Sequence, residues 1–375
     1  ASAEPSVTAR RTRSIGPSIF SCRVTDIDVN PADPTQFYVA YASGGLWKTE
    51  SNGSDFTPIF DHESVMTIGD IAVDWPRNII WVGTGEVNSS RSSYAGAGIF
   101  RSADGGKTWE NRGLTESHHI GRVLLNPEKP DEILVAALGH LYSPSMQRGI
   151  FKTSDGGKSW RNTLYVDPNT GGIDLIRDPS NPAILWAAMW ERERRAWMFK
   201  PSGEGSGIYK STDGGETWKL VSGGNSGFPK DEKTGRIGLD IFQKNGKTVL
   251  FASLDNQTPL AKKDDPDEDK SALKKDFFKN ISLEKLLEID EAQLDDFLKK
   301  NDFPEKYNAK SVKSGLKSGK ITPSAIYDFL DAGDDGFQNK GIVGLEIYRS
   351  EDGGTSWKRT HSENLEGVTN TYGYY

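Results

Sequence analysis

Three observations predict an all-β fold for this chain: a β-propeller of four-stranded blades with a small α-helical insertion. A nine-residue pattern containing Asp, two Gly, a hydroxyl residue and Trp begins at residues 101, 152, 210 and 349. Asp104, Asp155 and Asp213 follow one another at intervals of 51 and 58 residues, which is in the range of propeller blades. A charged segment with helical periodicity interrupts the last unit.

Each unit has the same order of elements: an alternating strand, a turn rich in Asn, Asp and Pro, a second strand, a Gly-containing loop, and two further strands. About five units are visible, and the final "TYGYY" resembles the first strand of a sixth. We therefore expect blades one to four and half of blade five in residues 1–256, a helical subdomain in 257–340, and the rest of blade five in 341–375. Further blades or subunits beyond Tyr375 are part of this expectation.

The repeated pattern has the chemistry of a self-locking hairpin between the third and fourth strands. Asp104 can accept hydrogen bonds from the turn, and Gly105 and Gly106 supply the positive φ of a tight reversal. Trp109 is expected to place its ring between neighbouring sheets. The first unit has a degenerate copy, with Ser51 and Phe56 at the Asp and Trp positions. The predicted structural residues are Asp104, Trp109, Asp155, Trp160, Asp213, Trp218, Asp352 and Trp357.

This pattern, S/T-x-D-x-G-x-T/S-W, resembles the Asp-box, or BNR repeat, of sialidases, xyloglucan-cleaving glycosidases and sortilin-type receptor propellers. "GGLWKT" and "GIYKSTDGGETW" are most similar to bacterial sortilin-like, VPS10-like proteins. The resemblance implies an extracytoplasmic propeller whose boxes lie away from the ligand site. The Asp-box therefore indicates the fold and leaves the activity open.

Composition excludes several classes of partner. The formal net charge is −7 and no basic stripe is present, so we expect no nucleic-acid ligand. Cys22 is the single cysteine, which excludes an internal disulfide. No apolar run is long enough for a membrane span. Nothing in the sequence implies an organic cofactor, so we expect none.

The loops between the second and third strands are long and varied, whereas the turns between the first and second strands are short. This one-sided elaboration predicts a binding face for a protein, peptide or glycan ligand. Aromatic rings and arginines on these loops can stack on sugars, anchor peptides or bind carboxylates. Arg192 and Arg195 are further loop arginines. The candidate ligand-binding residues are Tyr41, Glu86, Arg91, Tyr94, His140, Tyr142, Arg148, Trp190, Arg194 and Trp197.

The alternative function is a glycoside hydrolase with paired carboxylates in the central funnel, for which the candidates are Asp26, Asp70, Glu86 and Glu191. Aligned units place Asp26, Asp70, Arg122 and Asp174 in register, a pattern also typical of salt bridges between blades. Xyloglucan-cleaving relatives carry a catalytic Asp two residues before a Gly pair, where this chain has Ala42. A structural component of a larger secreted or surface assembly is the third alternative.

The five histidines all fall in loops. We interpret them as ordinary solvated residues and predict no metal site, since His118 and His119 are adjacent and cannot easily share one ion. Asp265, Asp267, Asp269 and Asp276 have calcium-loop spacing, but Lys270 replaces the required Gly, which favours a solvated linker.

The insertion contains three predicted helices. "ISLEKLLEI" is one, Asp290 caps a second whose apolar stripe is Leu294, Phe297 and Leu298, and Thr322 with Pro323 at its first turn opens a third. The insertion can serve as a lid or docking module, or as a packed decoration.

Overall fold

The computed structural model describes residues 23–195, 198–244, 246–260, 273–279, 281–301, 303–333, 341–363 and 365. The chain divides into two compact units. The larger comprises Ala1–Ala196, Lys200–Thr258 and Ile342–Tyr375, and the smaller comprises Trp197–Phe199 and Pro259–Gly341. Trp197, the calcium-like aspartates up to Asp269, and the "TYGYY" segment lie outside the described residues.

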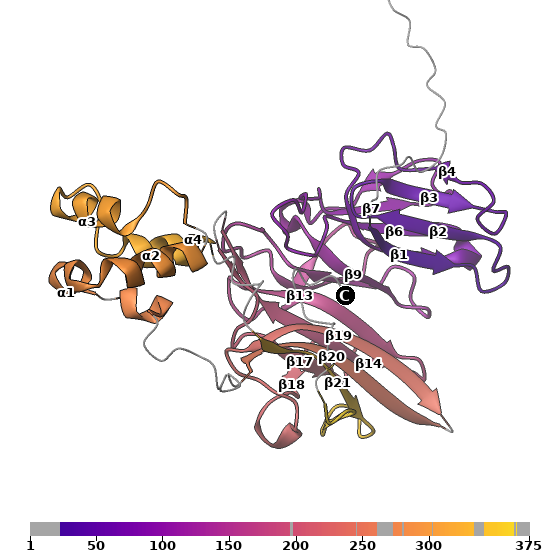
Figure 1. Ribbon diagram of the computed structural model, residues 1–375. Coiled ribbons are helices and arrows are strands. Elements are labelled where there is room, and N and C mark those ends of the chain that lie inside the picture. Colours follow the sequence, from indigo (N-terminus) through magenta and orange to yellow (C-terminus); the bar gives the residue numbers. More distant parts are fainter. Residues whose placement is uncertain are drawn as a thin grey trace, which may run out of the picture. The chain divides into compact units, whose positions relative to one another are not determined.

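The larger unit consists of five antiparallel four-stranded sheets, as predicted, in strict chain order from the inner strand to the outer one (Figure 1). The first two are β1 (Val24–Val29), β2 (Phe37–Tyr41), β3 (Gly45–Thr49) and β4 (Thr57–Pro58), and β5 (Ile68–Asp74), β6 (Ile79–Thr84), β7 (Ile99–Ser102) and β8 (Glu110–Asn111). The third is β9 (Ile120–Leu125), β10 (Ile133–Ala137), β11 (Gly149–Thr153) and β12 (Arg161–Leu164).

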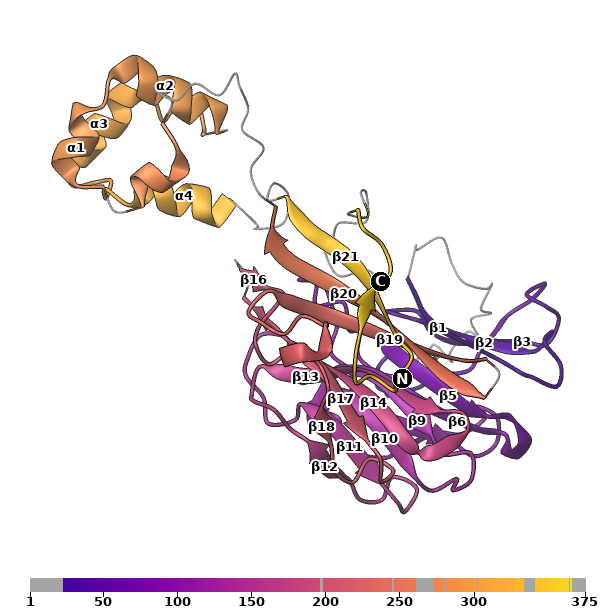
Figure 2. The same cartoon turned by 90° about the horizontal axis from the view of Figure 1, so that it is seen from below.

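The fourth sheet is β13 (Thr170–Asp178), β14 (Asn181–Glu191), β17 (Gly207–Ser211) and β18 (Lys219–Leu220). The fifth is β19 (Thr234–Lys244), β20 (Lys247–Pro259), β21 (Ile342–Ser350) and β22 (Lys358–Arg359), with the insertion between β20 and β21 (Figure 2). A two-stranded sheet pairs β15 (Glu193–Arg194) with β16 (Phe199–Lys200). Short 3₁₀ turns are η1 (Trp75–Arg77), η2 (Thr115–Ser117), η3 (Gly224–Ser226) and η4 (Lys275–Phe278).

The hydrophobic core lies between sheets rather than within them. Tyr38 and Leu46 of the first sheet pack with Ile71 and Phe100 of the second in one cluster. Further clusters join the second sheet to the third and the third to the fourth. A four-stranded sheet has two apolar faces and cannot cover either alone, so each blade depends on its neighbours. This arrangement confirms the predicted propeller architecture.

The Asp-box hairpins have the hydrogen bonds that their chemistry predicts. Asp104 Oδ1 accepts from Lys107 N at 3.0 Å and Thr108 N at 2.9 Å, and its Oδ2 accepts from Thr108 Oγ1 at 2.7 Å. Gly105 and Gly106 have φ of 72° and 89°. In the degenerate first copy, Asn52 and Gly53 take the two positive-φ positions. There the side chain of Asp55 hydrogen-bonds to Ser51, so the carboxylate has moved to another position of the turn.

The tryptophans of three boxes donate a hydrogen bond to the preceding blade. Trp109 Nε1 donates to Ile59 O at 2.7 Å, Trp160 Nε1 to Arg112 O at 2.7 Å, and Trp218 Nε1 to Thr163 Oγ1 at 3.1 Å. Trp357 differs, because its Nε1 bonds to Gly354 O of its own hairpin while its ring packs on Phe228. Each box therefore closes its own turn, and three of them also bond to the neighbouring sheet.

The smaller unit contains α1 (Leu283–Glu288), α2 (Glu291–Lys300), α3 (Ala309–Lys317) and α4 (Ala325–Gly333) around one buried cluster. Asp290 caps α2 and its apolar stripe is buried, as predicted. The predicted start of the last helix at Pro323 is wrong, because Thr322–Ser324 form a turn whose Thr322 carbonyl accepts from Ala325 N. The unpredicted α3 begins with a reciprocal Asn308 and Ser311 capping box. None of the helices in the described ranges is long and apolar enough to cross a membrane.

We expect the indole N–H of Trp109 to contribute measurably to the free energy of unfolding. Trp109→Phe should lose about 1 kcal/mol, because it removes one hydrogen bond and keeps most of the ring packing. Trp109→Ala should lose roughly 2 to 3 kcal/mol, less than a fully buried tryptophan, since Trp109 is half-buried. Urea unfolding of both variants measures this. Equal losses in the two variants would contradict a role for the hydrogen bond.

The boxes should also make stability depend on acid pH. Hydrogen bonds from Thr108 and Ser102 lower the pKa of Asp104 to about 2, below its unfolded value of about 3.9. A depressed folded-state pKa contributes stability that is present above pH 4 and is lost as the pH falls toward 2. Asp104→Asn should therefore unfold more easily at pH 7 and show a flatter pH dependence between 4 and 2. The exposed Asp61→Asn is the control, and an unchanged acid limb in Asp104→Asn would refute the assignment.

Candidate functional site

The inner strands carry a chain of charged side chains that bond one blade to the next. Asp26 Oδ2 accepts from Ile71 N at 3.2 Å, and Asp70 Oδ2 accepts from Val123 N at 2.6 Å. Asp174 Oδ2 accepts from Leu239 N at 2.7 Å in the same way. In each case the carboxylate of one inner strand bonds to the backbone of a following one. These aspartates are therefore part of the propeller's construction.

In the third sheet, Arg122 occupies the position that an aspartate has in the inner strands of the first, second and fourth sheets. It bonds to the second sheet and to the fourth. Its Nη1 lies 3.1 Å from Asp70 Oδ1, and its Nε lies 2.9 Å from Asp174 Oδ1. Salt bridges between blades, one of the two explanations for the aligned charges, are thus confirmed. The two carboxylates raise the pKa of Arg122, so the guanidinium remains charged.

A bulge in the inner strands makes these contacts possible. The register of β5 on β6 shifts between Ile68 and Asp70, and similar shifts precede Asp26 and Asp174. Gly69 lies in the β5 bulge, where an added Cβ would lie 2.0 Å from Ile120 O. Glycine is required here because the backbone of the next blade approaches too closely for any side chain.

The inner strands of the five sheets line an open cavity of ≈ 540 Å³. Asp26 and Asp70 both line it, together with Asp28, Arg122 and Asp240. Burial raises the pKa of Asp26 and raises that of Asp70 well above its usual range, against the opposing effect of Arg122. The volume suits a small ligand.

The other two candidate acids do not line this cavity. Glu86 is buried, forms an ion pair with Arg23, and accepts from Asn88 Nδ2 at 3.1 Å. Glu191 pairs with Lys200 Nζ at 3.0 Å and accepts from Gly205 N at 2.8 Å. The structure brings together Asp26 and Asp70, and places Glu86 and Glu191 in separate hydrogen-bonded positions. Ala42, which the sequence comparison placed at the position of an expected catalytic acid, is buried.

The loops between second and third strands contact one another, and their aromatic candidates differ in exposure. Tyr94 is 62% exposed and Tyr142 is 45% exposed, and Tyr142 Oη donates to Arg91 O at 2.9 Å across two loops. Trp190 is fully buried, donates to Pro201 O at 2.7 Å, and is therefore part of the core. Tyr41 is half-buried at the end of β2. The tyrosines, rather than Trp190, are accessible to a ligand.

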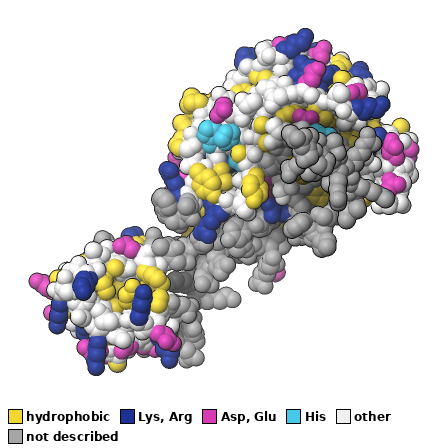
Figure 3. Space-filling model, turned by 90° about the horizontal axis from the view of Figure 1, so that it is seen from above, with side chains coloured by type: hydrophobic (Ala, Val, Ile, Leu, Met, Phe, Trp, Pro, Cys, Tyr) yellow, Lys and Arg dark blue, Asp and Glu magenta, His cyan; other side chains and the backbone are white. Residues whose placement is uncertain are grey.

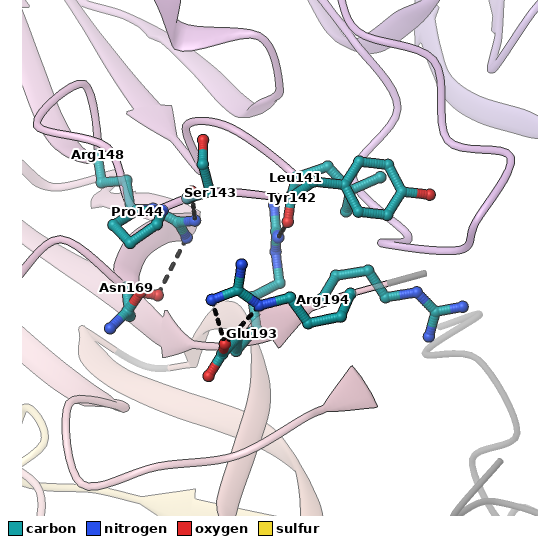
Figure 4. A pocket seen from close by; sticks show the side chains of 10 residues that line it. Leu141, Tyr142, Ser143, Pro144, Arg148, Asn169, Glu193 and Arg194 are labelled. Atoms are coloured by element: carbon teal, nitrogen blue, oxygen red, sulfur yellow. Dashed lines mark hydrogen bonds and ion pairs between the residues drawn. The ribbon is translucent and has the colours of Figure 1, made fainter. Parts of the chain in front are cut away.

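Beside Tyr142, arginines of two loops converge on one pocket (Figure 4). Its lining includes Tyr142, Arg148, Arg192, Arg194 and Arg195. The cavity is ≈ 10 Å³, which is room for about one water molecule. A bulky ligand would therefore contact the mouth of the pocket rather than its interior.

The arginines of this pocket are unusually buried. Arg148 donates to His140 O at 2.8 Å and Asn169 O at 3.0 Å, which holds its loop in place. Arg192 is 1% exposed, and burial together with neighbouring Arg148, Arg194 and Arg236 lowers its pKa well below the usual range. Among the residues that the structure describes, the Nε atoms of Arg148 and Arg192 have no hydrogen-bond partner. Glu193, the one acid among the described residues that line the pocket, bonds to Arg195.

The histidines depart from the prediction of ordinary solvated loop residues. His119 is buried, with Nδ1 2.7 Å from Glu86 O. His118 stacks on His140 with ring centroids 4.0 Å apart, and Glu116 lies beside both. The sequence did not predict this group, because His118 was considered together with the adjacent His119. Its partner in the structure is His140, which belongs to another loop.

We expect Arg122→Gln to destabilise the protein by about 3 kcal/mol at neutral pH, because it leaves the buried Asp70 carboxylate unpaired. Burial raises the folded-state pKa of Asp70, so protonated Asp70 contributes stability below its unfolded pKa, and this contribution is lost as the pH rises. The deficit of Arg122→Gln should therefore shrink on acidification toward pH 4. Urea titrations from pH 4 to 8 measure this. The double variant Arg122→Gln/Asp70→Asn is the control, and a deficit independent of pH would contradict the assignment.

Comparisons with known proteins identify a family model that matches the chain and several distantly similar proteins. The family model described as "Sortilin, neurotensin receptor 3" matches residues 97–303, more than half of the chain. A probable oligoxyloglucan-reducing end-specific xyloglucanase of Neosartorya fischeri is 25% identical over 218 residues, 53% of this chain. The corresponding xyloglucanase of Emericella nidulans is 23% identical over 219 residues. The chain spans 24% of each of these relatives, about a quarter of their length.

Solved structures that show similarity to this chain include an ancestral GH74 enzyme, 15% identical with a TM-score of 0.46, covering 62% of this chain and 31% of that one. A GH74 xyloglucanase from Xanthomonas campestris is 14% identical with a TM-score of 0.44, covering 91% of this chain and 45% of that one. YCF48 from Cyanidioschyzon merolae is 13% identical with a TM-score of 0.34, covering 94% of this chain and 88% of that one.

Proposed function

Because the chain belongs to the Sortilin-Vps10 family, we propose that it is an extracytoplasmic propeller that binds a protein, peptide or glycan ligand on the face of its long loops. The observation that carries this proposal is the pocket where Arg148, Arg192 and Arg194 lie together beside the exposed Tyr142. Arginine and tyrosine are the residue types that dominate binding energy at interfaces.

The electrostatics of the pocket favour an anionic group on the ligand. Four arginines and one glutamate line it, so its formal charge is positive although the chain as a whole carries −7. Guanidinium groups that are buried beside one another lose solvation and repel. A carboxylate at the pocket mouth would offset both effects and accept paired hydrogen bonds from a guanidinium. The proposed ligand chemistry is therefore an acidic group next to an apolar or sugar surface that stacks on Tyr94 and Tyr142.

The same contacts argue for binding rather than hydrolysis. Glycosidase chemistry needs one carboxyl group to donate a proton and a second to act as base or nucleophile. Glu86 and Glu191 are held by a cation and by N–H groups, and Asp70 is held by Arg122 and Val123 N. A carboxylate whose oxygens are bonded to cations and backbone N–H groups serves as a hydrogen-bond acceptor of the scaffold. We therefore interpret these acids as parts of the scaffold.

Hydrolysis of a glycan remains the second candidate, on one specific observation. Asp26 and Asp70 share the ≈ 540 Å³ cavity, and burial raises the pKa of both. A raised pKa is what a general acid requires. In this alternative the central cavity, not the loop face, would hold the sugar.

Binding of the full chain to acidic peptides, to their amidated counterparts and to a glycan array tests the proposal. Tyr142→Ala and Tyr94→Ala should weaken the strongest interaction by about tenfold or more, as expected for interface hot spots. Arg349→Gln, which replaces an exposed arginine at the start of the Asp-box of the fifth blade, is the control and should bind normally.

A parallel assay with xyloglucan oligosaccharides separates the two candidates. Unchanged affinity in both tyrosine variants would overturn the loop-face proposal. Hydrolysis in the cavity would be established instead if the chain cleaves the oligosaccharide, if Asp26→Asn or Asp70→Asn abolishes this activity, and if Glu86→Gln retains it.

A further inference from the structure

We propose that Glu116, His118 and His140 bind one Zn²⁺ ion. Glu116 and His118 belong to the connection between β8 and β9, and His140 to the loop between β10 and β11. The inference goes beyond the proposed ligand binding and does not depend on it. Histidine side chains reach the surface of the larger unit in Figure 3.

The donor atoms of the three side chains already face one another. Glu116 Oε2 lies 3.9 Å from His118 Nε2 and 3.7 Å from His140 Nε2. All three donor atoms lie within 4.8 Å of one another. Ligands at ~2.0–2.1 Å from a tetrahedral zinc are separated by about 3.3 Å. Small rotations of the exposed Glu116 and of the two partly exposed histidines are therefore enough to reach coordination distance.

A hydrogen bond on its Nδ1 orients His140 for metal binding through Nε2. Its Nδ1 lies 3.1 Å from Ser143 Oγ, and with Nδ1 as the donor the lone pair is on Nε2. Metal-bound histidines usually have such a partner on the other ring nitrogen. The Nε2 atom is buried and has no hydrogen-bond partner among the described residues. A buried nitrogen without a partner needs an explanation, and a bound cation supplies one.

The backbone that presents Glu116 and His118 is strained. Leu114 and His118, on either side of η2, both have φ of 55°. A positive φ is unfavourable for leucine and uncommon for histidine, and such strain is typical of functional positions. The turn places His118 against His140, while the next residue, His119, bonds inward to Glu86 O. The two adjacent histidines therefore have separate roles.

The donor set selects the class of metal. Two imidazoles and one carboxylate suit Zn²⁺ and related transition ions, whereas Ca²⁺ prefers oxygen ligands. Three protein ligands leave a fourth position for water or for a donor atom of a bound molecule. The side chains of His118 and His140 are 33% and 29% exposed, and that of Glu116 is 70% exposed. An ion can therefore enter from solvent without unfolding the loop.

Isothermal titration of the full chain with Zn²⁺, and with Ca²⁺ as the comparison, tests the site. One Zn²⁺ should bind per chain, and Co²⁺ in its place should give the visible absorption of a tetrahedral complex. His118→Asn and His140→Ala should each weaken Zn²⁺ binding by at least about tenfold. Asparagine is chosen at position 118 because it tolerates positive φ. Glu116→Gln, at an exposed position, tests the third ligand without risk to the fold.

His62→Ala removes an exposed histidine elsewhere and should leave the affinity unchanged. Thermal unfolding without metal identifies variants that fail to fold, in which case Glu116→Gln decides the outcome. Zn²⁺ binding that is equally tight in Glu116→Gln and His140→Ala would overturn the proposal. So would the absence of saturable Zn²⁺ binding in the unmodified chain, or preferential binding of Ca²⁺.

Discussion

The structure depends on contacts between sheets that are too thin to be stable alone. Each blade buries its apolar faces only against its neighbours, and hydrogen bonds from the inner strands and from the Asp-box tryptophans connect neighbouring blades. Near the axis, an aspartate carboxylate accepts a backbone N–H of a later inner strand, as Asp70 does from Val123. At the periphery, an indole N–H donates to the preceding blade, as Trp109 does to Ile59. Hydrophobic burial supplies the free energy, and these directional bonds set the spacing and order of the blades.

This construction explains why most of the fold was predictable from sequence. The hydrogen bonds that Asp104 accepts within its Asp-box span four residues or fewer, so the residues of the box identify the turn directly. Four copies define the period, and the strand order follows. The predicted helix start at Pro323 was wrong because a turn and a helix N-terminus share the same residue types, and the helix begins at Ala325.

The candidate site was less predictable because its geometry is non-local. Aligning the units identified Asp70, Arg122 and Asp174, which do bond together. Trp190 and Arg192 read from sequence as exposed loop residues, yet the structure buries both. His118 and His140 are 22 positions apart in the chain and come together only because two loops of neighbouring sheets project to one side. No pattern within a single unit contains that contact.

The fifth sheet shows how the fold tolerates foreign sequence. Its strands β20 and β21 are neighbours in the sheet but are separated by the whole insertion, from Pro259 to Ile342. The entropy of closing a loop rises only with the logarithm of its length, about 0.6 kcal/mol for each doubling. A compact module in this loop therefore costs the blade little, and during synthesis the first four blades can assemble before β21 leaves the ribosome. Evolution can exchange such a module without altering the blades that carry it.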